Sequence, residues 1–198
     1  HANGDAAIDA MIAGVRAAQA QHPDAGDLRP VLIHGQTLRE DQVDALKQLG
    51  IFPSLFPMHT FYWGDWYKEI VGPERAARIS PMRSILNTGL HATSHTDAPV
   101  ALPNLMQVVW ATVNRTSRSG PIIGPDERVT PYEAMKMITL WGAEQFGEQA
   151  TKGSLEPGKL ADMVILSDNP LTIDPMKINK IVVLETIKEG KTVYKRRQ

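Results

Sequence analysis

The sequence predicts an α/β fold in which strands and helices alternate as far as residue 155, followed by a smaller antiparallel part over residues 156–198. Three observations support this class. Short apolar runs are each followed by a segment with helical periodicity. These runs are nearly continuous, as in parallel strands that are buried on both faces. Beyond residue 155, turn-rich sequence and a β-hairpin pattern replace the alternation.

Composition narrows the class of partners. The chain has 198 residues, enough for one sizeable domain, and its formal net charge of -1 argues against nucleic acid or an anionic membrane as a partner. It contains no run of about 18 apolar residues, so we expect no transmembrane span. The amino-terminal segment is amphipathic, unlike a signal peptide. Without cysteine, any metal must be held by His, Asp, Glu or a modified Lys. The compartment stays open, with the cytoplasm slightly favoured.

The first predicted helix begins shortly after His1. Gly4 permits a turn, Asp5 can cap the helix, and an apolar stripe with helical spacing runs through residues 8–19. His1 therefore stands where the end of a strand is expected. Its own sequence context does not distinguish a functional histidine from a structural one.

The next two units repeat this pattern. Residues 30–34 form a buried-strand pattern that ends on His34, and Thr37 with Glu40 predicts a capping box for a helix that stops at Gly50. Residues 51–56 read as a further strand, and His59 follows it. A predicted loop then carries an aromatic cluster, which either lines a pocket or packs in the core. Its members are Phe61, Tyr62, Trp63, Trp66 and Tyr67.

The segment around Asp97 joins a strand to a helix. Two short helices are expected at residues 74–79 and 81–87, the second with Ser80 as its cap and Pro81 at its first position. A β-prone run at residues 89–94 precedes Asp97. Prolines end this run, and Asn104 caps a helix over residues 105–112. Asp97 thus lies at the carboxyl end of a strand, where α/β barrels build their sites. Alternatively, it caps a turn beside Pro99.

The remaining elements follow from capping and hairpin signals. Thr130 and Glu133 predict a second capping box, which opens a helix that extends to Trp141. Residues 162–166 read as a strand. Residues 181–188 and 192–194 read as the two arms of a hairpin.

His1, His34 and Asp97 each end or follow a predicted strand. In a parallel barrel such positions converge at one mouth. Two neutral imidazoles and a carboxylate suit Zn²⁺ or a similar divalent ion, and Asp97 would either bind the ion or accept a proton from the attacking water. Taken singly, either histidine is as consistent with a structural role.

Four motifs occur in order along the chain: His-Ala-Asn-Gly-Asp at residues 1–5, Ile-His at 33–34, Ser-His-Thr-Asp-Ala-Pro-Val at 94–100 and Gly-Ser-Leu-Glu-Pro-Gly-Lys-Leu-Ala-Asp at 153–162. Together they resemble the amidohydrolase superfamily, specifically its family-3 branch that includes N-substituted formamide deformylases. The resemblance implies a metal-dependent (β/α)8 barrel with a small β-sandwich, and hydrolysis of C–N bonds in small-molecule amides or formamides by water that one or two metal ions activate.

The resemblance also assigns roles to residues. His1 and His34 match metal-binding histidines that end the fifth and sixth strands of the family's barrel. Asp97 matches the eighth-strand aspartate, which binds metal and carries the proton from water to the leaving amine. His59 would contact the substrate or the oxyanion. Independently of the resemblance, the aromatic segment that contains Trp63 would shape an apolar substrate pocket. His95 would face the substrate, or else support its neighbours or lie in the core.

The chain departs from the family pattern. The first-strand His-x-His pair, the fourth-strand lysine and the amino-terminal part of the sandwich are absent, and His95 stands where the family more often has a small residue. We therefore expect residues 1–155 to form the second half of the barrel and residues 156–198 the carboxyl-terminal strands of the sandwich. Such a portion would be inactive alone, and its exposed strand edges would favour a homo-oligomer or other association. The alternatives are a non-catalytic fragment or oligomerising half-barrel, and a deaminase of the same superfamily.

Overall fold

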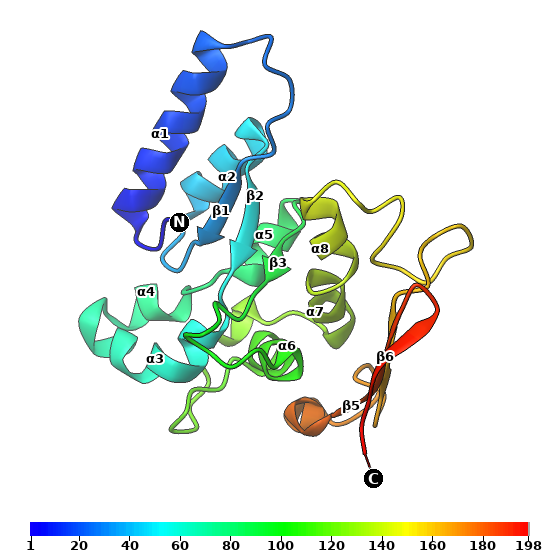
Figure 1. Cartoon of the computed structure of the whole chain (residues 1–198). Coiled ribbons are helices and arrows are strands. Elements are labelled where there is room, and N and C mark those ends of the chain that lie inside the picture. Colours follow the sequence, from blue (N-terminus) through cyan, green and yellow to red (C-terminus); the bar gives the residue numbers. More distant parts are fainter. Residues whose placement is uncertain (198) are drawn as a thin grey trace.

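A computed structural model of the chain, which describes residues 1–197, confirms the α/β class. A parallel sheet at its centre has the order β1-β2-β3, with bounds Val31–His34, Phe52–Leu55 and Thr93–Ser94 (Figure 1). Ala2 extends this sheet on the β1 side through a parallel bridge to His34. The amide of Ala2 donates to the Ile33 carbonyl at 3.1 Å. Four chain segments therefore run in the same direction.

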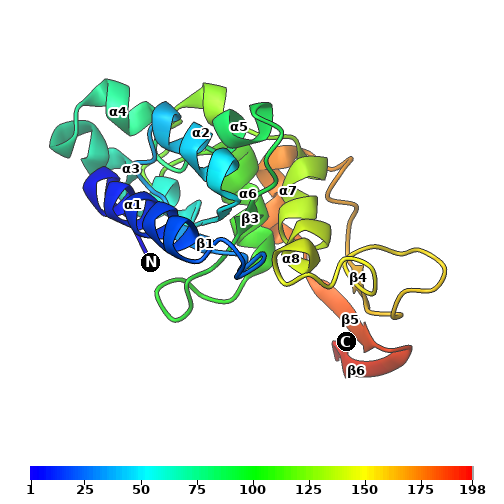
Figure 2. The same cartoon turned by 90° about the horizontal axis from the view of Figure 1, so that it is seen from above.

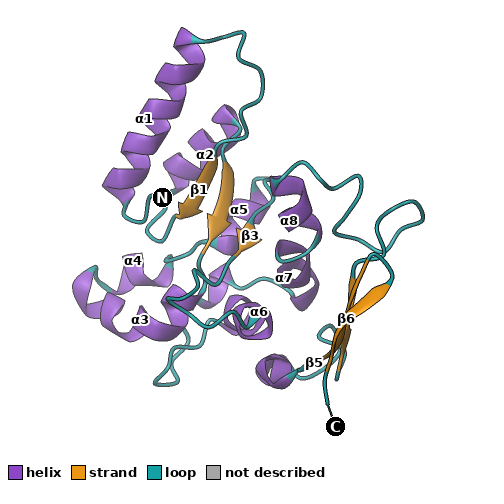
Figure 3. Ribbon diagram, viewed as in Figure 1, coloured by secondary structure: helices purple, strands orange, loops and turns teal. Residues whose placement is uncertain are grey.

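Helices follow the strands in the expected alternation (Figure 3). The carboxyl ends of β1 and β2 point towards the region of α3 and α4 (Figure 1). The helices are α1 (Asp5–Gln21), α2 (Glu40–Leu49), α3 (Met58–Ile70), α4 (Pro73–Ala77), α5 (Met82–Asn87), α6 (Leu105–Asn114), α7 (Pro131–Met137) and α8 (Leu140–Gln145), with 3-10 turns η1 (Pro125–Glu127) and η2 (Pro175–Lys180).

The core lies between the parallel sheet and these helices. Its side chains come from both kinds of element, and burial of each contributes about 1.5–3 kcal/mol. Completely buried members are Ile8, Leu32, Leu46, Ile51, Leu55, Met82, Ile85, Val109 and Met137. Of the helices that the structure describes, none combines the length and apolar character needed to cross a membrane.

A second, antiparallel sheet confirms the predicted hairpin. It comprises β4 (Met163–Leu166), β5 (Val183–Lys188) and β6 (Lys191–Lys195) and stands apart from the parallel sheet (Figures 1 and 2). The η2 turn, which precedes β5, packs against α6. The indole nitrogen of Trp110 donates to the Met176 carbonyl at 3.1 Å, and the Ile178 side chain is completely buried.

Several predicted helix boundaries are confirmed. Gly50 ends α2 in the left-handed conformation, with φ 66. The Asn104 side chain caps α6 by accepting from the Gln107 amide at 3.2 Å. The capping box of Thr130 and Glu133 opens α7.

The predicted start of α2 is wrong. Thr37 and Glu40 form no capping box because the Thr37 amide donates to the Asn3 carbonyl, which holds Thr37 in the preceding turn. The N-cap is Arg39 instead, and the Gln42 side chain accepts from its amide at 3.0 Å.

Other boundaries also differ from the prediction. The predicted aromatic loop is helix α3, in which Phe61 and Tyr62 pack against the core on one side. Gly4 rather than Asp5 is the N-cap of α1, and α5 begins one residue later than predicted, with Pro81 as N-cap. The helix expected to reach Trp141 is broken at Thr139, which has a ψ of -93 and donates its hydroxyl proton back to the Met135 carbonyl.

Candidate metal centre

His34 ends β1 at the mouth of the parallel sheet. It is 5% exposed and has a φ of 84, a left-handed conformation that turns the chain directly after the strand. Gly35 continues the turn with a φ of 56. A Cβ at Gly35 would lie 3.0 Å from Leu55 and 3.2 Å from Leu32, so the turn packs tightly on the strand ends. The imidazole of His34 is thereby fixed at the carboxyl edge of the sheet.

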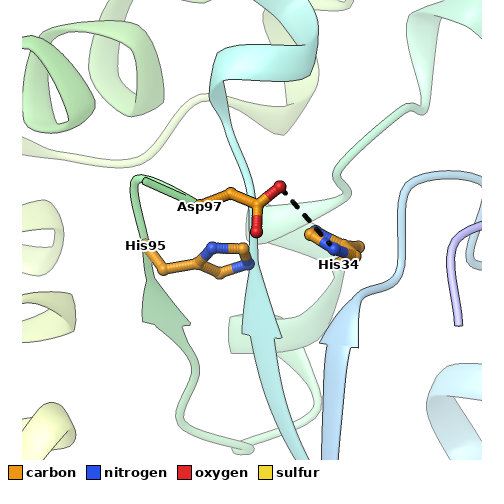
Figure 4. Close-up of side chains that lie close together, drawn as sticks. All are labelled: His34, His95 and Asp97. Atoms are coloured by element: carbon orange, nitrogen blue, oxygen red, sulfur yellow. Dashed lines mark ion pairs between the residues drawn. The ribbon is translucent and has the colours of Figure 1, made fainter. Parts of the chain in front are cut away.

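His95 and Asp97 come from the segment directly after β3. The His95 amide donates to the Leu55 carbonyl at 3.0 Å, and its ring stacks on Phe56 with centroids 5.4 Å apart. Asp97 has a φ of 51, and its Oδ2 lies 4.0 Å from Nε2 of His34. Figure 4 shows the three side chains converging. One ligand atom from each lies within 4.8 Å of the others.

His1 lies beside this group without joining it. Its ring centroid is 4.4 Å from that of His34, in an edge-on arrangement, and the residue is exposed. The cluster of potential ligands in the described residues contains His34, His95 and Asp97. The structure therefore brings together two of the three predicted ligands, adds His95, and leaves His1 at the rim.

His59 and Trp63 border the cluster from α3. The His59 ring is 6% exposed and lies 5.9 Å from the His34 ring and 4.8 Å from Phe56. Trp63 lies 5.8 Å from His59 and 6.3 Å from Phe56. Histidine and aromatic rings thus form a continuous wall next to the ligand cluster. By contrast, Trp66 is 59% exposed and points away from the core.

Burial keeps these imidazoles neutral. Burial, together with the neighbouring His34, lowers the pKa of His59 to about 3 and that of His95 to about 4. The pKa of His34 is also lowered, because burial outweighs the opposing effect of the Asp97 carboxylate. A neutral imidazole is the form that binds a metal.

The donor set fits a divalent ion. Among the described residues, the buried Nε2 of His95 has no hydrogen-bond partner. Leaving such a group unsatisfied costs about 1–3 kcal/mol, which a ligand bond would recover. Two histidines and one carboxylate are also the protein ligands of many catalytic zinc sites, which keep a further position open for water or substrate.

Two functional candidates, Ser80 and Arg115, are absent from the predicted site. Both have left-handed backbone conformations and are buried; the Ser80 hydroxyl lies 3.5 Å from Nδ1 of His59, and Arg115 donates to the Ser80 carbonyl. Nothing local in the sequence marks them, because the pattern around Ser80 resembles an ordinary helix cap and Arg115 follows a long apolar helix.

Comparison with known proteins identifies the family to which the chain belongs. The chain is 28% identical over 197 residues to the N-substituted formamide deformylase of Arthrobacter pascens, an alignment that covers 99% of this chain and 36% of that protein. It is 32% identical over 196 residues to the protein LONG AFTER FAR-RED 3 of Arabidopsis thaliana, covering 98% of this chain and 33% of that one. The chain thus spans about a third of the length of these curated relatives.

A solved structure shares the fold. The uncharacterized metal-dependent hydrolase from Pyrococcus horikoshii superimposes with a TM-score of 0.72 and 23% identity, covering 88% of this chain and 34% of that one. The sequence model described as "Amidohydrolase family" matches residues 1–194, nearly the whole chain. The chain therefore belongs to the amidohydrolase family.

Proposed function

We propose that this chain supplies part of the active site of a metal-dependent hydrolase that cleaves C–N bonds in amides or formamides. His34, His95 and Asp97 would hold a divalent ion, with Zn²⁺ the best match, and His1 would complete the ligand set at the rim. The observation that carries the proposal is the convergence of two neutral imidazoles and a carboxylate at the carboxyl edge of the sheet.

When bound, such an ion would lower the pKa of a water molecule and polarise the substrate carbonyl. The side chains have complementary tasks. Asp97 is partly exposed, so its carboxylate can accept the proton of the attacking water and return it to the leaving amine. Trp63 offers the substrate an apolar surface, and His59 beside it can form a hydrogen bond with the substrate.

We further propose that the chain works together with segments beyond these residues. Residues 1–155 would form the carboxyl-terminal half of a (β/α)8 barrel, and residues 156–198 would contribute strands to a small β-sandwich. The parallel order of β1, β2 and β3 supports the first assignment, and the separate antiparallel sheet supports the second. Further metal ligands would then come from the other half, and the 198 residues alone would be inactive.

Metal binding provides the first test. Isothermal titration of the 198-residue chain with Zn²⁺ should give near-stoichiometric binding, weakened at least tenfold by His34→Ala, His95→Ala or Asp97→Asn. His91→Ala is the matched control, because His91 pairs with Glu144 and stacks on Trp141 outside the cluster. Binding that these three substitutions leave unchanged would contradict the assignment.

Hydrolysis provides the second test. A protein with this chain and its flanking segments should release formate or carboxylate from an N-substituted amide, and Asp97→Asn should slow the reaction by about 10²–10⁴-fold. Ammonia release from an aminopurine, without amide cleavage, would favour the deaminase. Zn²⁺-dependent hydrolysis by the 198 residues alone would contradict the need for a second half.

A further inference from the structure

Ser80 is held rigidly behind the candidate metal centre. It lies between α4 and α5, is completely buried and has a φ of 49. Its amide donates to the Gln36 carbonyl at 2.8 Å, and its own carbonyl accepts from Nη1 of Arg115 at 3.0 Å. These two bonds hold the backbone of Ser80 in place.

Arg115 acts as the clamp for this segment. Its guanidinium is bonded to three backbone carbonyls: Nη2 donates to Ile79 at 2.7 Å, Nη1 to Ser80, and Nε to Ile123 at 2.7 Å. The residue is 1% exposed and adopts a φ of 53, a conformation that glycine would occupy with less strain. Burying a cation is costly, and the three carbonyls compensate for the water that the guanidinium loses.

The Ser80 hydroxyl connects this clamp to His59. Its Oγ donates to the Phe56 carbonyl at 3.3 Å and lies 3.5 Å from Nδ1 of His59. A hydroxyl carries one proton, so a proton directed at Phe56 leaves a lone pair facing Nδ1. A neutral imidazole can fill that position only if the proton sits on Nδ1.

We propose that Arg115 and Ser80 are positioning residues that hold His59 as the Nδ1–H tautomer, with the lone pair on Nε2. The tautomer of a metal-site histidine is commonly set in this way by the partner of its other nitrogen. One consequence rests on the proposed function. An Nε2 lone pair accepts a hydrogen bond, so His59 would face the N–H of a substrate rather than a developing oxyanion.

Nitrogen-15 NMR of the metal-free, labelled chain tests the tautomer directly. At about pH 8 the ring is neutral in any case, and we expect a protonated Nδ1 and an unprotonated Nε2 for His59. Ser80→Ala removes the acceptor and should shift His59 towards the Nε2–H form. An Nε2–H form in the unmodified chain, or no change in Ser80→Ala, would overturn the proposal.

The role of Arg115 is tested in the same spectra. The single ammonium nitrogen of Arg115→Lys cannot reach the three carbonyls that Nε, Nη1 and Nη2 of the guanidinium bond separately, so the His59 signals should move towards a mixture of tautomers. Arg83→Lys is the control: Arg83 bonds Glu133 and the Arg128 carbonyl, away from Ser80, and its loss should leave the tautomer unchanged. An unchanged tautomer in Arg115→Lys would show that Arg115 is merely structural; should that variant not fold, Ser80→Ala still decides. These spectra need neither metal nor substrate, so their outcome is independent of the hydrolysis assays.

Discussion

Backbone strain is concentrated around the candidate metal centre. Among the described residues, six that are not glycine have positive φ, and four of these belong to the site or support it: His34, Ser80, Asp97 and Arg115. Such a conformation costs about 1–3 kcal/mol per residue and persists only where the surroundings impose it. The strained residues are therefore those whose side chains carry the imidazole, hydroxyl, carboxylate and guanidinium of the site and its support.

Two glycines offer contrasting predictions at this scale. Gly124 has a φ of 61, and a Cβ there would lie 1.6 Å from the Ala77 carbonyl oxygen, so Gly124→Ala should lower the free energy of unfolding by about 2–4 kcal/mol. Gly14, inside α1, has nothing within 4 Å of the corresponding position. Gly14→Ala should therefore raise stability by about 0.5–1 kcal/mol. Urea unfolding measures both, and equal effects would contradict this account.

At the scale of elements, the first turn of α7 makes the free energy of unfolding depend on pH. Glu133 closes the capping box and binds Arg83 through both oxygens, with Nη1 to Oε1 at 2.9 Å and Nη2 to Oε2 at 2.6 Å. The hydrogen bonds from Arg83 lower the pKa of Glu133 from 4.5 to about 2. Because the folded state holds this carboxylate ionised, its contribution is complete above the ordinary pKa and is lost as the pH falls towards 2.

The variant Glu133→Gln should reveal this dependence. We expect a loss of about 1–2 kcal/mol of unfolding free energy at neutral pH, discounted for partial exposure of the pair. The difference from the unmodified chain should shrink steadily as the pH falls from 4.5 to about 2. Urea titrations across that range provide the measurement; a difference independent of pH would rule out the ionised pair as its cause.

The same scale shows what a sequence can and cannot reveal. Strands such as residues 31–34, the Asn104 cap and the Thr130 capping box follow from local patterns, because each depends on residues a few positions apart. The aromatic segment around residues 61–67 reads locally as a loop, whereas in the structure it lies in helix α3, where Phe61 packs edge-on against Trp110 of α6. The grouping of His95 with His34, and the clamp formed by Arg115, depend on residues far apart along the chain, so no local pattern reveals them.

At the scale of the whole molecule, the junction between η2 and α6 connects the two sheets. Asn114 donates to the Pro175 carbonyl at 2.9 Å, and Ile178 is completely buried against the core. Ile178→Ala should therefore cost about 2–4 kcal/mol. Hydrogen exchange should show β4–β6 losing protection together with α6, whereas loss confined to the antiparallel sheet would mean that the junction is not cooperative.

Association remains a prediction at this scale. In the described part of the chain, β3 pairs with β2 alone, so its other edge offers free backbone groups to a further strand. Sedimentation of the 198-residue chain should show concentration-dependent self-association. A monomer throughout the micromolar range would contradict it.

The ring wall beside the candidate metal centre gives the molecule an optical reporter. Trp63 lies 5.8 Å from His59, which in turn lies 5.9 Å from His34. Cu²⁺ generally binds nitrogen and oxygen ligands more tightly than Zn²⁺ does, and its open d-shell quenches a nearby indole, whereas closed-shell Zn²⁺ does not. Added Cu²⁺ should quench the emission of Trp63, and a large excess of Zn²⁺ should restore it by competition, so that occupancy of the site can be followed by fluorescence without any label.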